Sequence, residues 1–148
     1  TATLTTSALS PEAYQVNVTY YGDANFTLST PGTPVNHVVI PAATSTSLVA
    51  AFSPDLFKRH LILTATVTTA QPTGTAVAGT VTFLDGVTPL ATVALDASGT
   101  AELVLPDVIR GSTYNITAAY DAAPGYLPSA EMKDIFIPHI LLLINVMK

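Results

Sequence analysis

The sequence predicts an all-β protein that folds as an antiparallel β-sandwich. Apolar residues occupy every second position through most of Gly79–Tyr126, as expected for strands with one buried face. The Asp- and Gly-containing segments LDG, DASG and DAAPG interrupt this alternation where tight turns are needed. Thr, Ala and Val are abundant, whereas 11 Pro and 8 Gly residues disfavour long helices.

The alternating pattern also assigns the buried face of each strand. A first strand is expected over Ala43–Ala51, and the turn-rich segment Ser53–His60 connects it to the next. Later strands are joined through the turns Asp85-Gly86 and Asp96–Gly99. The residues predicted to face the core are Leu61, Leu63, Ala65, Val67, Val81, Phe83, Leu90, Val93, Leu95, Ala101, Leu103, Leu105, Tyr114, Ile116, Ala118 and Tyr120.

Four segments occur in an order that resembles a known family. HLILTATVTTAQPTG is followed by GTVTFLDG, PLATVALDASGTAEL and ITAAYDAAPGYLPS, and together they resemble the bacterial immunoglobulin-like repeat over Leu61–Ser129. The resemblance implies a seven-stranded immunoglobulin-like sandwich, repeated in tandem on large exported surface proteins and generally without catalysis. Asp121-Ala122 replaces the usual Gly-Asp after the second Tyr, which predicts a different loop shape there.

Tyr114 lies at the beginning of the strand with the clearest inward row. It follows Gly111 and the loop Pro106–Ser112. We therefore expect its hydroxyl to bond to the backbone of that loop, in the manner of a tyrosine corner.

An internal repeat relates the first residues to a later part of the chain. Ser7–Thr30 parallels Asp107–Ala130 at an offset of 100 residues, and Thr1–Leu4 parallels Thr100–Leu103 at an offset of 99. The segment 33–43 is expected to form a last strand, with Val35, His37 and Val39 on one side. The matched pairs are Tyr14 with Tyr114, Val16 with Ile116, Tyr20 with Tyr120 and Phe26 with Tyr126.

This repeat predicts the domain organisation. Residues 1–42 are interpreted as the C-terminal three strands of one module, which is incomplete alone, and residues 43–138 as a complete module. Residues 139–148 are apolar at consecutive positions and fall where the first strand of a next module would begin. This segment is too short to span a bilayer, which needs about 20 apolar residues, so no membrane span is predicted.

Both ends of the chain are thus expected to present β-surface that lacks a cover. The expected inward face of the first segment contains Leu4, Tyr14, Val16, Val18 and Tyr20. One interpretation is an excised or processed chain, which the lack of a signal peptide favours. The other is head-to-tail association, in which residues 139–148 of one copy add as a donor strand to residues 1–42 of the next and build a filament.

The composition argues against several kinds of partner and site. The net charge is −5 with only five Lys and Arg, which argues against nucleic acid because phosphate binding needs clustered cations. Cysteine is absent, so neither disulfides nor thiolate metal sites form. With the family resemblance, this favours an extracellular or cell-surface structural protein that binds other copies of itself.

No residue is assigned a catalytic, cofactor-binding or metal-binding role. The histidines His37, His60 and His139 are isolated, and no G-x-S-x-G, Walker or G-x-G-x-x-G motif occurs. The basic cluster Lys58-Arg59-His60 is interpreted as a solvated loop edge rather than an anion site. The carboxylates of predicted turns or linkers are interpreted as turn caps rather than calcium ligands; they are Asp23, Asp85, Asp96, Asp121 and Asp134.

An adhesin or a carbohydrate-binding module, with a cell-surface or glycan partner, is the alternative function. It is weakened because Trp is absent and only Tyr21 is expected to face outward from a strand. Three N-x-T triplets begin at Asn17, Asn25 and Asn115, and the side chains of Asn17 and Asn115 are expected to point outward.

Overall fold

The computed structural model describes residues 1–6, 9–30, 32–53, 60–69 and 77–139, and all regular structure among them is β. The chain divides into two compact units, Thr1–Pro41 (unit 1) and the part from Ala42 onward (unit 2). The all-β prediction is confirmed. The strands are β1 (Ala13–Val16), β2 (Val35–Val38), β3 (Thr44–Phe52), β4 (Leu61–Thr69), β5 (Gly79–Asp85), β6 (Thr88–Ala94), β7 (Thr100–Leu105), β8 (Thr113–Ala122) and β9 (Ser129–Phe136).

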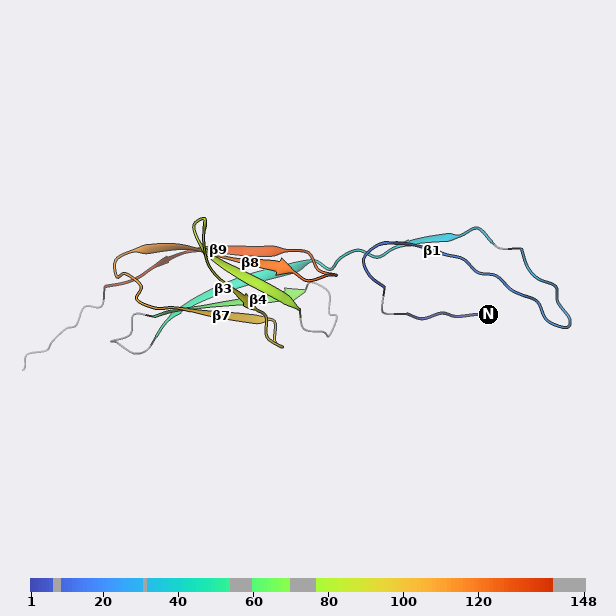
Figure 1. The fold of residues 1–148 in the computed structure, drawn as a ribbon, viewed down its shortest axis with the longest axis horizontal. Coiled ribbons are helices and arrows are strands. Elements are labelled where there is room, and N and C mark those ends of the chain that lie inside the picture. The colour runs from blue at the N-terminus through green and yellow to red at the C-terminus, as the bar shows by residue number, and fades with distance from the viewer. Residues whose placement is uncertain (7–8, 31, 54–59, 70–76, 140–148) are drawn as a thin grey trace, which may run out of the picture. The chain divides into compact units, whose positions relative to one another are not determined.

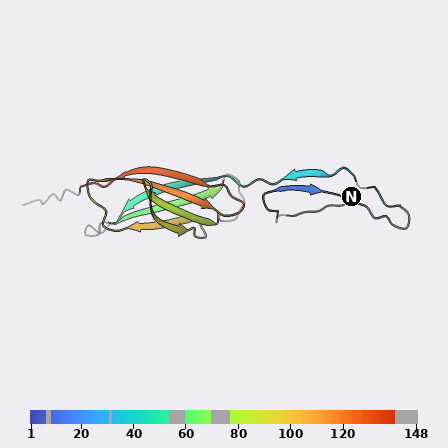
Figure 2. The same ribbon diagram turned by 45° about the horizontal axis from the view of Figure 1, so that its top comes forward.

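Unit 2 is a sandwich of two antiparallel sheets, which Figures 1 and 2 show from two directions. One sheet has the strand order β3-β4-β7 and the other β6-β5-β8-β9. The predicted loop Ser53–His60 joins β3 to β4, and the Ser53 amide donates to the His60 carbonyl at 3.0 Å; residues 54–59 lie outside the described residues.

The core lies between the two sheets and contains most of the predicted inward residues. Alternate residues of β4 and β8 are buried because a strand presents successive side chains to opposite faces. The buried apolar residues are Leu48, Leu61, Leu63, Ala65, Val67, Val77, Val81, Phe83, Ala101, Val108, Ile116, Ala118, Tyr120, Ile135 and Ile137, with Val93, Leu95, Leu103, Leu105 and Tyr114 half-buried against them.

The prediction for Leu90 is wrong. Its side chain is 37% exposed, whereas Val93 on the same strand packs against the core. Leu90 and Val93 are three positions apart, and this odd spacing places their side chains on opposite faces of an alternating strand. The pairing is also irregular here: Phe83 pairs with Ala91 but Leu84 pairs with Pro89, so Leu90 has no residue opposite it on β5.

Unit 1 contains the hairpin of β1 and β2, with Ala13 opposite Val38 and Val16 opposite Val35. The third expected strand, Thr1–Leu4, does not form, and residues 1–6 have no regular structure. In the repeat these residues correspond to β7, which pairs with β4. Since the described part of unit 1 contains no counterpart of β4, Thr1–Leu4 has no ladder to join.

Candidate interaction surface

The candidate site is an apolar row on the hairpin of unit 1. Val16 is 46% exposed, Val18 69% and Tyr20 43%, whereas Tyr14 is half-buried. Val35 and Val38 on β2 are also exposed. A two-stranded hairpin is marginal in water by itself, and exposed apolar rows of this kind mark surfaces that bind a partner.

The hydrogen bonds of unit 1 repeat those of β8 and β9. The Val39 amide donates to the Glu12 carbonyl at 3.0 Å, and the Ile137 amide donates to the Ser112 carbonyl at 2.9 Å. The two donors are 98 residues apart and the two acceptors 100 apart. The hairpin of unit 1 is therefore a structural counterpart of the β8–β9 hairpin.

A tyrosine at the beginning of each hairpin supports the same correspondence. The Tyr14 hydroxyl donates to the Ser10 carbonyl at 2.9 Å. The Tyr114 hydroxyl accepts from the Ile109 amide at 3.0 Å, which confirms the predicted tyrosine corner. Tyr14 pairs with His37 and Tyr114 with Ile135, so both tyrosines occupy the same register.

The counterpart row in unit 2 is covered. Ile116 and Ala118 are 0% exposed and Tyr120 is 1% exposed. They belong to one core cluster with residues of the opposite sheet, among them Leu48 and Leu63. The same β-surface is thus buried in a complete sandwich and exposed in unit 1.

The sandwich of unit 2 is closed along β3 and β9 mainly by side chains. Just before the two strands begin, Ala42 and Tyr126 form an isolated parallel bridge. From there the hydroxyl of Ser129 lies 2.8 Å from that of Thr44 and 2.7 Å from that of Thr46. These contacts seal one edge of β3, which would otherwise be open to pairing with another chain.

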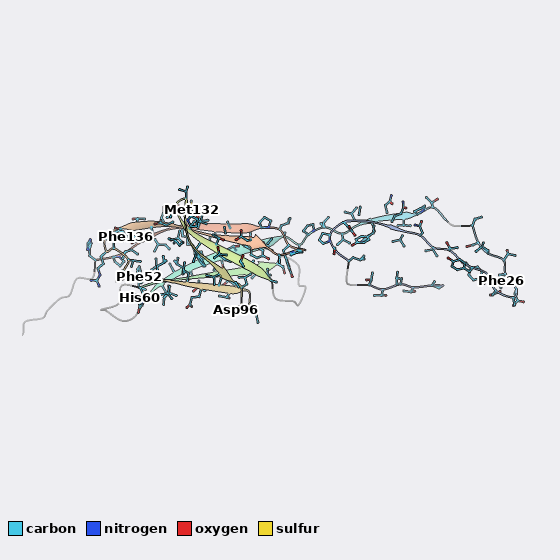
Figure 3. All side chains as sticks on the ribbon, in the orientation of Figure 1. Phe26, Phe52, His60, Asp96, Met132 and Phe136 are labelled. Atoms are coloured by element: carbon cyan, nitrogen blue, oxygen red, sulfur yellow. The ribbon has the colours of Figure 1, made fainter. Side chains whose placement is uncertain are left out.

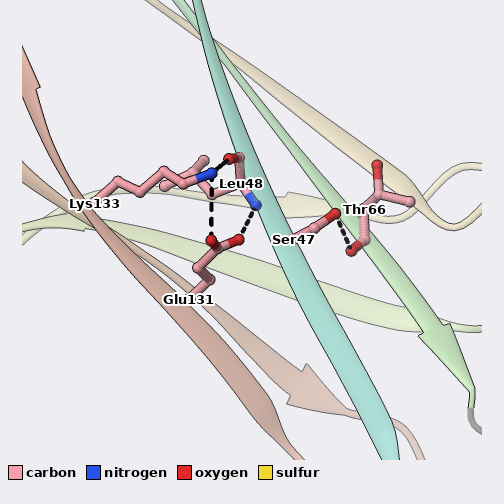
Figure 4. A network of polar contacts seen from close by, with 5 residues as sticks. All are labelled: Ser47, Leu48, Thr66, Glu131 and Lys133. Atoms are coloured by element: carbon pink, nitrogen blue, oxygen red, sulfur yellow. Dashed lines mark hydrogen bonds and ion pairs between the residues drawn. The ribbon is translucent and has the colours of Figure 1, made fainter.

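Glu131 and Lys133 continue these side-chain contacts between β3 and β9 at Leu48 (Figure 4). The Leu48 amide donates to Glu131 Oε2 at 2.5 Å, and Lys133 Nζ donates to the Leu48 carbonyl at 2.5 Å. Lys133 Nζ and Glu131 Oε1 are 3.3 Å apart. The Leu48 amide, followed by the hydrogen bond from Lys133, holds the pKa of the Glu131 carboxyl below its usual value.

Two of the five carboxylates cap turns as predicted. Asp23 Oδ1 accepts from the amides of Asn25 and Phe26, and Asp96 Oδ1 accepts from those of Ser98 and Thr100. Hydrogen bonds lower the pKa of both carboxyls. The largest effect comes from the Tyr20 side chain for Asp23 and from the Ser98 side chain for Asp96.

The prediction of turn positions is wrong for the other three. Asp85, Asp121 and Asp134 lie on β5, β8 and β9. Asp85 accepts from the Asn115 amide, Asp121 from the Thr82 hydroxyl and Asp134 from the Asn115 side chain. Among the described residues, no three His, Cys, Asp or Glu side chains gather closely enough to hold a metal ion.

The remaining sequence candidates lie apart from one another. His37 is exposed on β2, His60 is half-buried before β4, and the ring of exposed His139 lies beside Gly111. Lys58 and Arg59 lie outside the described residues. Tyr21 is 86% exposed as predicted, but Phe26 in the nearby turn is also 68% exposed (Figure 3), which alternation alone did not indicate.

The strand order of unit 2, the two packed sheets and the tyrosine corner define an immunoglobulin-like β-sandwich. Residues 42–134 match the bacterial Ig-like domain (group 3), and this chain belongs to that family. Domains of the family are typically non-catalytic and are typically found in exported surface proteins. Neither a curated protein nor a solved structure gave a significant match to the chain. Nowhere in the described ranges is there a helix with the length and apolar character needed to cross a membrane.

Proposed function

We propose that this chain is a non-catalytic structural protein of the bacterial cell surface that associates with copies of itself by strand complementation. The observation that supports it best is the contrast between equivalent residues: Val16 is 46% exposed in unit 1, whereas Ile116 is fully buried in unit 2. A second copy would supply a β-strand that packs on the row of unit 1, where in unit 2 the strands of the opposite sheet cover the equivalent row.

The geometry of such a contact favours a filament. The surface that receives strands lies in unit 1, and the candidate donor, Ile140–Met147, is at the other end of the sequence and outside the described residues. Donor and acceptor are therefore different surfaces, so the contact is heterologous and can propagate from copy to copy. Burial of the apolar row and pairing of open backbone groups would both stabilise it.

The test is the oligomeric state of the full chain, measured by analytical ultracentrifugation over a range of concentrations. We expect concentration-dependent oligomers for the wild type and monomers for Val16→Asp, which places a charge in the apolar row. Deletion of Ile140–Lys148, which leaves His139 beside Gly111, should also give monomers.

Asn17→Asp is the matched control, because it adds the same charge at the neighbouring exposed position. It should associate as the wild type does. A wild type that stays monomeric at all concentrations, or a deletion variant that assembles normally, would reject the proposal.

A second candidate is an adhesive module, supported by the exposed aromatic side chains of Tyr21 and Phe26. Aromatic rings with an open face can stack on sugar rings, and such residues are typical of carbohydrate sites. Binding of the monomeric Val16→Asp variant to a glycan array, lost on Tyr21→Ala, would favour this function.

A further inference from the structure

The turn of the unit 1 hairpin presents Asn25 at its tip. The Asp23 amide donates to the Phe26 carbonyl at 2.8 Å and closes the turn. Asp23 Oδ1 accepts from the amides of Asn25 at 2.8 Å and Phe26 at 2.9 Å. Asn25 and Thr27, the ends of the triplet Asn25-Phe26-Thr27, are both exposed. The Asn25 side chain is therefore exposed to solvent on a turn that hydrogen bonds to Asp23 hold in place.

The triplet at Asn115 is held very differently. Asn115 lies in β8 between β5 and β9, and its backbone amide donates to Asp85 Oδ1 at 3.0 Å. Its side-chain Nδ2 donates to Asp134 Oδ1 at 2.6 Å, and both Asn115 and Thr117 are half-buried. The nitrogen that a modification would use is already bonded, which corrects the expectation that this side chain is freely reachable.

The triplet at Asn17 is intermediate. Asn17 is exposed, but Thr19, the hydroxyl residue of its triplet, is half-buried. The segment follows directly after β1, where successive side chains point to opposite sides of an extended chain. An enzyme that must reach both Asn17 and Thr19 meets a less open surface than at Asn25.

The repeat shows that the tip position stays open in a complete sandwich. Asn25 corresponds to Gly125 at the offset of 100 residues. A Cβ built on Gly125 meets no atom within 4 Å, although unit 2 is fully assembled. A side chain at this place is therefore not covered when the row of Val16, Val18 and Tyr20 is covered.

We propose that Asn25 is the acceptor of an N-linked glycan, transferred from a lipid-pyrophosphate-linked oligosaccharide. Asn25 Nδ2 forms a bond to the anomeric carbon of the first sugar, and the bond from that carbon to the pyrophosphate oxygen breaks. The lipid pyrophosphate leaves with the electron pair, and one amide proton passes to a base of the transferase. Asp23 acts as a positioning residue that holds the turn, and the inference does not depend on self-association.

The test uses the purified, folded full chain with a bacterial oligosaccharyltransferase and its lipid-pyrophosphate-linked oligosaccharide, in a reaction that fully converts a control peptide. Intact mass should increase by one oligosaccharide. No Lys or Arg precedes Lys58, so trypsin leaves Asn17 and Asn25 on one peptide, and the site must be assigned by fragmentation along the backbone.

Variants separate the three acceptors. Asn25→Gln should reduce modification at least tenfold, whereas Asn17→Gln and Asn115→Gln should leave it unchanged. Asp23→Ala, which removes the brace of the turn, should slow transfer to Asn25, and the urea-unfolded chain should gain modification at Asn115. Equal or greater occupancy of Asn17 or Asn115 in the folded chain, or an unmodified Asn25, would overturn the proposal.

Discussion

Glu131 Oε2 accepts a hydrogen bond from the Leu48 amide at 2.5 Å and so attaches β3 to β9 through a side chain (Figure 4). The two residues are 83 positions apart in the sequence. With Lys133, which bonds the Leu48 carbonyl, this carboxylate satisfies backbone groups on the edge of β3 that faces β9.

We expect Glu131→Gln to loosen β3 in particular. The neutral side-chain amide of Gln loses the charge-assisted hydrogen bond from the Leu48 backbone and the ion pair with Lys133. Hydrogen exchange measured by mass spectrometry should become faster in Thr44–Phe52 and stay unchanged in β5. Glu102→Gln is the control, since Glu102 is an exposed carboxylate on β7. Equal acceleration in β3 and β5 would show a general loss of stability instead.

The lowered pKa of Glu131 predicts a decrease in stability in acid. Its usual value is 4.5, and the Leu48 amide lowers the pKa in the folded state. Because the folded form holds the proton less tightly than the unfolded form, this contribution is fully present above 4.5 and is lost as pH falls through the folded pKa. Thermal melting followed by circular dichroism should show a decreasing Tm below about pH 4.5, with a smaller slope for Glu131→Gln. An identical slope would assign the effect to other carboxylates, such as Asp96.

The buried faces of unit 2 were predictable because alternation is local. Ile116, Ala118 and Tyr120 lie two positions apart, and their burial follows from the geometry of any strand packed on one face. The Asp96 turn was predictable for the same reason, because its carboxylate bonds amides two and four residues away.

The side-chain contacts between β3 and β9 and the bulge in β6 were not predictable, because both depend on which residues of another strand lie opposite. No local pattern indicates that Glu131 bonds Leu48. The outward position of Leu90 follows from alternation counted from Val93, but the register shift, in which Leu84 pairs with Pro89, is not contained in the sequence of β6 alone. The exposure of the apolar row of unit 1 was predictable, because the internal repeat places Val16 over Ile116 without the strands that cover Ile116 in unit 2.

Gly79 should resist substitution more strongly than Gly125. Its φ is +130°, and a Cβ there would lie 2.6 Å from Tyr120 Cε2, whereas Gly125 has a φ of +96° with open space around it. We expect Gly79→Ala to lower the free energy of unfolding by about 3 kcal/mol and Gly125→Ala by about 1 kcal/mol. Urea denaturation of the two variants measures the difference. Equal losses of unfolding free energy would mean that the positive φ alone sets the cost of both substitutions and that the contact with Tyr120 adds nothing.

The tyrosine corner predicts a modest effect at Tyr114. Tyr114→Phe removes the acceptor of the Ile109 amide and should lower the free energy of unfolding by about 1 kcal/mol. Tyr14→Phe removes the equivalent hydroxyl from unit 1, whose partner is the Ser10 carbonyl. Urea denaturation of unit 2 should be unchanged by that control. A Tyr114→Phe variant as stable as the wild type would assign the residue to packing alone.

The two faces of β6 lead to opposite predictions for two of its apolar residues. Val93 packs against the core, so Val93→Ala removes buried methyl groups and should cost about 1–2 kcal/mol. Leu90 is 37% exposed and lies at the register shift, so Leu90→Ala should change the free energy of unfolding by less than about 0.5 kcal/mol. Thermal and urea denaturation of both variants provide the comparison. A larger loss for Leu90→Ala would mean that Leu90 also packs against the core.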